Sequence, residues 1–166
     1  MITNISGLAH RKPGYRSRQV VGIKAVVVHH TAAGEQSAEE IAKFHVESRG
    51  FPGIGYHYLI HRGGAVEKVN AVRTVSFHCG EWNRRAVGVA VVGNLERGLA
   101  TDRQWGVLVE LVTELCRAFG VGAAQVVGHR EVPGARTLCP GRNMDMERLR
   151  KEVVELMAVC NEGEVG

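Results

Sequence analysis

Residues 24–30, Lys-Ala-Val-Val-Val-His-His, decide how this chain folds. An unbroken run of β-branched residues, with no alternation of polar and apolar side chains, is typical of a strand buried on both faces. The run ends in two histidines, where the strand leaves the core and its side chains can meet solvent or a ligand. Because neighbouring side chains of a strand point to opposite faces, at most one of His29 and His30 should be a ligand, and the other should be a hydrogen-bonding neighbour or a core residue. The stretch therefore predicts a central buried strand with one functional histidine at its end.

The rest of the chain alternates helices and strands around this stretch. Ser37-Ala-Glu-Glu has the Ser-x-x-Glu pattern of a capping box and predicts a helix that Gly50 can end. Thr101-Asp-Arg-Gln predicts a second capped helix that ends before Gly120. Asp145 is expected to cap a last amphipathic helix, and the predicted strands are 55–61, 65–69, 86–92 and 125–129. We therefore expect an α/β fold: a single domain with a central mixed β-sheet flanked by about three α-helices.

Length and composition exclude several classes of protein. The chain has 166 residues, of which 45% are hydrophobic and 23% are charged. These values are ordinary for one globular domain. Its longest apolar runs are far shorter than the roughly 18 residues of a membrane helix. The first twenty residues lack the apolar centre of a secretory signal, so we expect cytoplasmic localisation on synthesis. Four cysteines without a CxxC pair favour reduced thiols.

The net charge of +4 comes from the N-terminal end. Residues 1–34 contain five basic and no acidic residues, which leaves 16 basic and 17 acidic residues in the rest of the chain. The excess of basic residues is therefore not spread over the fold, which argues against a nucleic-acid partner. We divide the chain into a basic N-terminal extension (1–23), a domain (24–160) and a C-terminal tail (161–166). Residues 11–18 would suit an anionic cell-envelope polymer, or would simply pack on the domain.

Two histidines and a cysteine at the ends of predicted elements are a plausible zinc set. His29 and His129 each end a predicted strand, and Cys139 follows in the loop Thr-Leu-Cys-Pro-Gly. Three such ligands leave a fourth position open for water, as catalytic zinc requires. The three positions are too far apart in the sequence to form a local metal motif, so ordinary buried histidines remain an alternative. A nucleophilic Cys139 with a histidine base is a further alternative.

Five segments, taken in order, resemble one known family. They are VVVHHTAAG (26–34), GYHYLIHRGG (55–64), HCGEWNRRAVGVAVVGN (78–94), TDRQWGVLVELV (101–112) and GHREVPGARTLCPG (128–141). Together they resemble the zinc-dependent N-acetylmuramoyl-L-alanine amidases, which include bacteriophage lysozyme-type amidases and peptidoglycan recognition proteins. The resemblance covers about residues 24–158 and implies a peptidoglycan recognition protein-like fold.

The resemblance also implies roles for individual residues. It assigns one Zn²⁺ to His29, His129 and Cys139, and an active-site role to Tyr56. Thr137 matches a position that holds Thr or Lys in active members, and non-catalytic members typically lose the cysteine that is present here. His78 and Asn83 match positions that line the family's glycopeptide groove, although this match is looser because Cys79, Glu81 and Trp82 are not the commonest residues there. Apart from the resemblance, Trp82 is a candidate platform for stacking on a sugar, or a partly buried loop aromatic, and His30 is a further candidate for substrate contact.

By the same resemblance, the chain is expected to hydrolyse the amide between the lactyl group of N-acetylmuramic acid and L-alanine of the stem peptide. Peptidoglycan would be its partner and a monomer its default state. A phage or prophage endolysin, which acts on the cell wall after the membrane is permeabilised, is the expected biological role. The alternatives are a host cell-wall recycling amidase and a non-catalytic peptidoglycan-binding or regulatory module.

Overall fold

The computed structural model describes residues 1–4 and 7–162, with side chains to Val159. Its main sheet has six strands in the order β1-β5-β4-β7-β3-β8. These strands are β1 (Ile2–Asn4), β5 (Val66–Lys68), β4 (Tyr58–Ile60), β7 (Ala86–Val91), β3 (Ala25–His30) and β8 (Val126–Gly128). Pairing is parallel except between β4 and β5, so the sheet is mixed, as predicted. Residues 163–166, most of the expected C-terminal tail, lie outside the described part.

The central strand β3 forms within residues 24–30, where a buried strand is predicted. All six of its residues are buried, and it lies parallel between β7 and β8. Val26 and Val28 belong to the larger apolar core, whereas Val27 packs in a separate cluster on the other face. By this alternation His29 falls on the side of Val27, which is opposite to the larger core. The strand thus delivers one histidine to each face.

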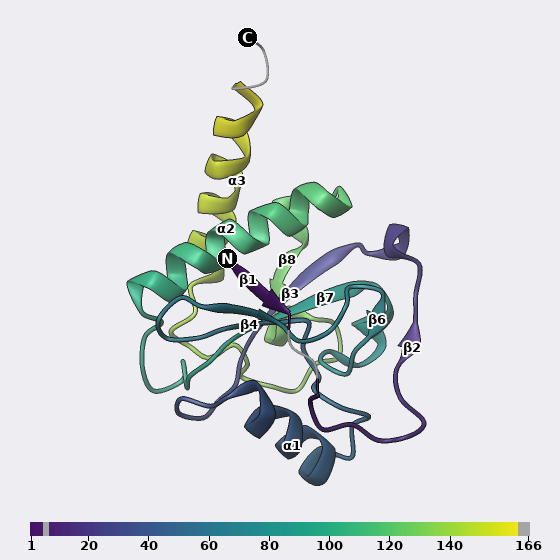
Figure 1. Ribbon diagram of the computed structural model, residues 1–166. Helices are drawn as coiled ribbons and strands as arrows, with labels where there is room; N and C mark the ends of the chain where they lie inside the picture. The colour runs from purple at the N-terminus through teal and green to yellow at the C-terminus, as the bar shows by residue number, and fades with distance from the viewer. Residues whose placement is uncertain (5–6, 163–166) are drawn as a thin grey trace.

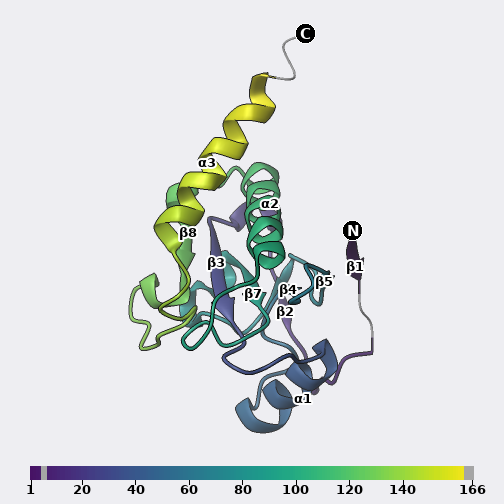
Figure 2. The ribbon, with the colours of Figure 1, turned by 90° about the vertical axis from the view of Figure 1, so that its left-hand side faces the viewer.

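Three helices cover the two faces of the sheet (Figure 1). Helix α1 (Ala38–Arg49) lies on one side, and α2 (Asp102–Phe119) and α3 (Met146–Glu162) lie together on the other, as the turned view in Figure 2 also shows. Both predicted capping boxes are present, and Gly50 and Gly120 end α1 and α2 in left-handed conformation, with φ of 68° and 62°. Helix α3 packs on α2, where the Trp105 indole donates a hydrogen bond to Glu152. The predicted fold class is confirmed.

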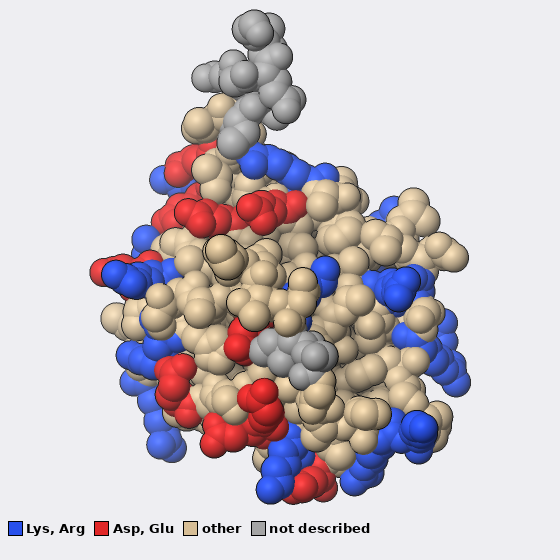
Figure 3. Space-filling model, in the orientation of Figure 1, with Lys and Arg blue, Asp and Glu red and all other residues tan. Residues whose placement is uncertain are grey.

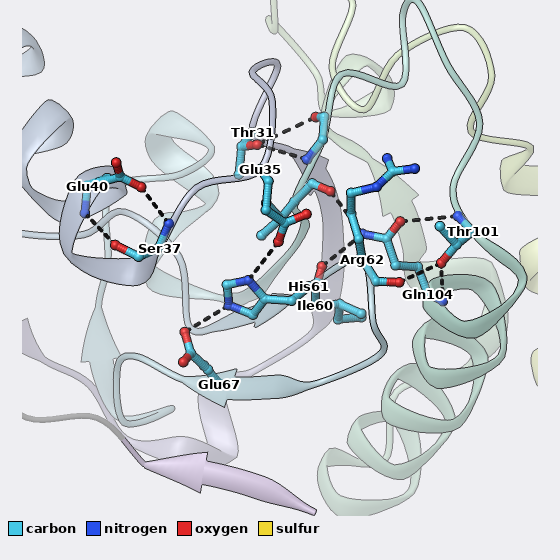
Figure 4. A network of polar contacts seen from close by, with 12 residues as sticks. Thr31, Glu35, Ser37, Glu40, Ile60, His61, Arg62, Glu67, Thr101 and Gln104 are labelled. Carbon is cyan, nitrogen blue, oxygen red and sulfur yellow. Dashed lines mark hydrogen bonds and ion pairs between the residues drawn. The ribbon is translucent and has the colours of Figure 1, made fainter.

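Polar contacts fix the loops between these elements (Figure 4). The buried Gln104 side chain accepts from the backbone of Thr101 and donates to the carbonyls of Ile60 and Val92. This ties the start of α2 to the ends of two strands. His61 lies between two carboxylates, Glu35 at 3.4 Å and Glu67 at 2.9 Å, which joins the loop after β3 to the β4–β5 hairpin.

The N-terminal segment packs against the rest of the chain. β1 pairs with β5 at the edge of the main sheet, and β2 (Arg16–Ser17) pairs with β6 (Thr74–Val75) in a separate two-stranded sheet. The Tyr15 hydroxyl donates to the carbonyl of Ile54, and the half-buried Arg18 side chain donates to three backbone carbonyls. Of the two interpretations of residues 11–18, these contacts favour packing for Tyr15 and Arg18. Within the described residues, no helix combines the length and apolarity needed to cross a membrane.

Candidate active site

The three predicted metal ligands come together at one end of the parallel strands. His29 lies at the carboxyl end of β3, His129 directly follows β8, and Cys139 lies in the loop beyond it. Because β3 and β8 are parallel neighbours, their carboxyl ends meet at the same edge of the sheet. One ligand atom from each side chain lies within 4.8 Å of the other two. Cys139 Sγ is 3.5 Å from His29 Nδ1.

Burial keeps this cluster uncharged. His29 is 1% exposed, and burial, followed by the neighbouring histidines, lowers its pKa well below the ordinary 6.5. Burial also lowers the pKa of His129 and raises the pKa of the Cys139 thiol to about 11. Two neutral imidazoles and a sulfur at this spacing match the nitrogen and sulfur donors that zinc prefers. The donor set therefore fits a zinc ion that would exchange for the thiol proton.

Tyr56 and Thr137 stand beside the three ligands. The Tyr56 ring centroid lies 5.2 Å from that of His29. Burial, followed by the charge of the Cys139 thiolate, raises the pKa of Tyr56, so its hydroxyl is a proton donor at neutral pH. The Thr137 hydroxyl accepts a hydrogen bond from the Cys139 backbone, at 3.1 Å. Both side chains line the same cavity as the ligands.

This cavity has a volume of about 440 Å³ and extends from the ligands to α1. Its far wall is aromatic, with Phe44 46% exposed and Phe77 40% exposed. Arg49 and Arg136 are the basic residues along it, and its lining contains no Asp or Glu among the described residues. A second cavity, of about 540 Å³, adjoins the first through His129. His129 therefore lies between two cavities, and the cavity that all three ligands line has no acidic side chain among the described residues.

The structure separates the four residues expected to contact substrate. His30 and His78 line the first cavity, although His30 Nδ1 also accepts a hydrogen bond from the Leu95 backbone. Trp82 lines the second cavity, with the Arg85 guanidinium stacked 4.3 Å from its ring centroid. The Asn83 side-chain oxygen accepts from the backbone of His78 and Cys79, and Asn83 lines neither of these two cavities. Substrate contact by these residues stays a prediction.

Several lining residues have no counterpart in the sequence analysis. Helix α1 contributes Phe44 and Arg49, and loops contribute Phe51, Phe77 and Arg136. The buried His45 of helix α1 also lines the cavity, and its Nδ1 accepts from the Gly55 backbone. Glu131 caps its own 3-10 turn through Gly128 and pairs with Arg150.

The sequence matches the N-acetylmuramoyl-L-alanine amidase family over residues 17–142. The chain belongs to this family. Among curated relatives of this chain, peptidoglycan-recognition protein SC2 of Drosophila melanogaster is 29% identical over 127 residues, which cover 71% of the chain and 68% of that protein.

Solved structures give the same family assignment for the whole domain. The endolysin N-acetylmuramoyl-L-alanine amidase LysCS from Clostridium intestinale superposes with a TM-score of 0.82 at 25% identity, covering 93% of this chain and 95% of that chain. The Ph2119 endolysin from a Thermus scotoductus bacteriophage superposes with a TM-score of 0.74 at 28% identity, covering 92% and 99%. Both the recognition proteins and the endolysins therefore share this fold.

Proposed function

We propose that this chain is a zinc-dependent peptidoglycan hydrolase that cleaves the amide between the lactyl group of N-acetylmuramic acid and L-alanine. The observation that carries the proposal is the cluster of His29, His129 and Cys139, whose ligand atoms lie within 4.8 Å of one another beside Tyr56. Family membership and the likeness to endolysin amidases support the same reaction.

His29, His129 and Cys139 would hold the metal. A zinc ion held by three protein ligands supplies a Lewis acid and lowers the pKa of a water toward about 7. The chain's own residues bind and orient the amide. The protonated Tyr56 hydroxyl donates to the carbonyl oxygen as negative charge develops on it, and Thr137 offers a second hydroxyl on the same wall. Of the three ligands, His29 is buried, and His129 and Cys139 are partly exposed.

The residues present favour this reaction over two alternatives. A cysteine nucleophile needs a lowered thiol pKa, whereas burial raises the pKa of Cys139 to about 11. A non-catalytic recognition module would have no need of a cysteine at this position, and here Cys139 faces His29 at 3.5 Å. The complete set of ligands, together with Tyr56, supports an enzyme.

An endolysin is the biological role that we propose, because two solved structures that this chain resembles are endolysins. In that role the protein is made in the cytoplasm and reaches the wall once the membrane is permeabilised. A host cell-wall recycling amidase is the alternative role. The two roles differ in where the enzyme meets its substrate, and the reaction is the same in both.

Exposed basic residues of the N-terminal segment would hold the enzyme on an anionic envelope polymer. Arg11, Lys12 and Arg16 are exposed, and Figure 3 shows Lys and Arg side chains along the edge where β2 runs in Figure 1. Replacing all three by Gln should weaken sedimentation with purified walls at low salt and leave cleavage of soluble muropeptides unchanged. Equal wall binding by both proteins at low salt would contradict this role.

The bond that is cut tests the proposed function. Purified peptidoglycan is digested, and the new ends are identified by labelling free amines and by mass spectrometry. We expect new N-terminal alanine, intact glycan strands and no new reducing sugars. New reducing ends, or an N-terminus other than alanine, would contradict the proposal. Cys139→Ser is the matched variant and should release no alanine termini.

A further inference from the structure

A chain of polar contacts connects the N-terminal segment to the candidate metal centre. It begins at the Arg18 guanidinium, which donates to the carbonyls of Val72 at 2.8 Å, Asn83 at 2.8 Å and Ala86 at 2.7 Å. These carbonyls belong to three separate parts of the chain: the turn before β6, the 3-10 turn at Gly80–Arg84 and the start of β7. Arg18 therefore fixes the position of the Ala86 carbonyl from outside the main sheet.

The Ala86 carbonyl also determines the protonation of His78. His78 Nε2 lies 3.3 Å from this oxygen. A carbonyl oxygen can only accept, so the proton of His78 is on Nε2. His78 is buried, and no carboxylate is among its hydrogen-bond partners in the described part of the chain, so the ring is neutral with one N–H. His78 Nδ1 is therefore an acceptor.

This acceptor in turn selects the tautomer of His29. His78 Nδ1 lies 3.0 Å from His29 Nε2. Nε2 of His29 therefore carries the proton and donates it. The lone pair of His29 is then on Nδ1, the atom that faces Cys139 Sγ at 3.5 Å. The chain of contacts thus leaves the lone pair of His29 Nδ1 available to bind a metal.

The surroundings hold His78 in this orientation. Its backbone N–H and that of Cys79 donate to the Asn83 side-chain oxygen, at 2.9 and 2.7 Å. A Cβ at position 88 would lie 2.8 Å from the His78 ring, so the ring occupies the space that Gly88 leaves open. The ring is 7% exposed. Packing and hydrogen bonds therefore hold His78 beside His29, in addition to its place in the cavity lining.

We propose that Arg18 and His78 are positioning residues for the metal ligand His29, because together they fix the tautomer that presents Nδ1 to the metal. The inference rests on the proposed zinc function and adds a role for a residue of the basic N-terminal segment. Partners of this kind, which hold the second nitrogen of a metal-binding histidine, typically contribute about 10- to 100-fold in metal affinity.

The test is zinc affinity, measured by competition with a chromophoric chelator at a temperature where each metal-free variant is folded by circular dichroism. We expect Arg18→Met and His78→Phe to weaken zinc binding by about 10- to 100-fold. His78→Asn keeps a polar atom near the position of Nδ1 and should retain most of the affinity. Arg16→Met, an exposed neighbour of Arg18 in β2, is the control and should bind zinc as the wild type does. Bound Co²⁺ should show an altered visible spectrum in Arg18→Met and His78→Phe only.

A purely structural role for Arg18 and His78 gives a different result. It would lower the unfolding temperature of the metal-free variants and leave zinc affinity and the cobalt spectrum of the folded proteins unchanged, which would overturn the inference. If Arg18→Met or His78→Phe does not fold, Arg18→Lys decides. The single Nζ of lysine cannot occupy the positions of both Nε and Nη1 of Arg18, so measurably weaker zinc binding by Arg18→Lys supports the inference and wild-type affinity overturns it. A wild-type protein that binds no zinc would instead overturn the proposed function.

Discussion

Each buried histidine has a different partner, and the partner determines what the ring can do. His57 accepts from the Gly88 backbone through Nδ1 and contacts the Thr74 carbonyl through Nε2, so both of its nitrogens are used within the fold. His30 accepts from Leu95. His29 has His78 at Nε2 and the Cys139 sulfur facing Nδ1, whereas His78 has His29 at Nδ1 and both the Ala86 carbonyl and the Cys79 sulfur near Nε2. Residue type alone therefore does not separate a ligand from a structural histidine in this chain.

Tyr56 offers the most specific test of a single residue. Tyr56→Phe removes one hydroxyl donor from a buried site and leaves the ring in place. We expect kcat to fall by about 10²- to 10³-fold, because a donor to the developing oxyanion is lost. KM and zinc stoichiometry should stay close to the wild type. A kcat near the wild-type value would show that the hydroxyl does not act on the reacting carbonyl.

The candidate site was predictable from the sequence only in part. The family resemblance singled out His29, His129, Cys139 and Tyr56, and the structure brings these together. The chain itself gave no sign that Arg18 or Asn83 supports His78. Arg18 is far from His78 in sequence and acts through the Ala86 carbonyl, and Asn83 accepts from a backbone N–H, a group that carries no sequence signal. In the sequence, a basic residue in a segment without acidic residues looks the same whether its side chain faces solvent or donates to three backbone carbonyls.

At the scale of elements, local signals predicted the helices well and the short strands poorly. Ser37 and Thr101 mark helix starts because their side chains satisfy free backbone N–H groups, a requirement that is local in sequence. Strands β1, β2 and β6 have two or three residues each and no apolar alternation, so only their distant partners define them. The hairpin strands β4 and β5 are shorter than the predicted 55–61 and 65–69, because pairing with other strands also sets where they begin and end.

Two glycines in different elements should respond to alanine in opposite ways. Gly88→Ala in β7 places a methyl group 2.8 Å from the His78 ring. This overpacking should lower the free energy of unfolding by about 1–3 kcal/mol. Gly106→Ala lies on the exposed side of α2 with no neighbouring atom within 4 Å. It should raise the free energy of unfolding by about 0.5–1 kcal/mol. Urea unfolding of the two variants measures both effects, and destabilisation of the same size at both positions would contradict the close packing around His78.

At the scale of the whole molecule, the buried histidines should make the fold sensitive to acid. Burial lowers the pKa of His45 to about 4 and that of His57 to about 3, so the unfolded chain takes up protons below pH 6.5 that the folded chain cannot. The free energy of unfolding of the metal-free protein should therefore fall by about 2 kcal/mol per such histidine between pH 7 and pH 5. His45→Gln should reduce this loss. Equal stability at pH 7 and pH 5 would contradict the assigned burial.

The distribution of charge also belongs to the whole molecule. The excess of basic residues at the N-terminal end was evident from the sequence, but its division into buried and exposed members was not. Arg18 is used inside the fold, whereas Arg11, Lys12 and Arg16 remain exposed. The basic residues of the N-terminal end therefore make both a structural contact near the candidate metal centre and a basic surface at the edge of the molecule.

The central claim is that one zinc ion at His29, His129 and Cys139 makes this fold an amidase. The most direct test is to strip the protein with a strong chelator, add zinc in steps and follow the release of alanine-terminated peptides from purified peptidoglycan. We predict that stripped protein is inactive, that activity returns in full at one zinc per chain, and that Cys139→Ser does not recover. Full activity in the stripped protein, abolished by alkylation of Cys139, would contradict the account.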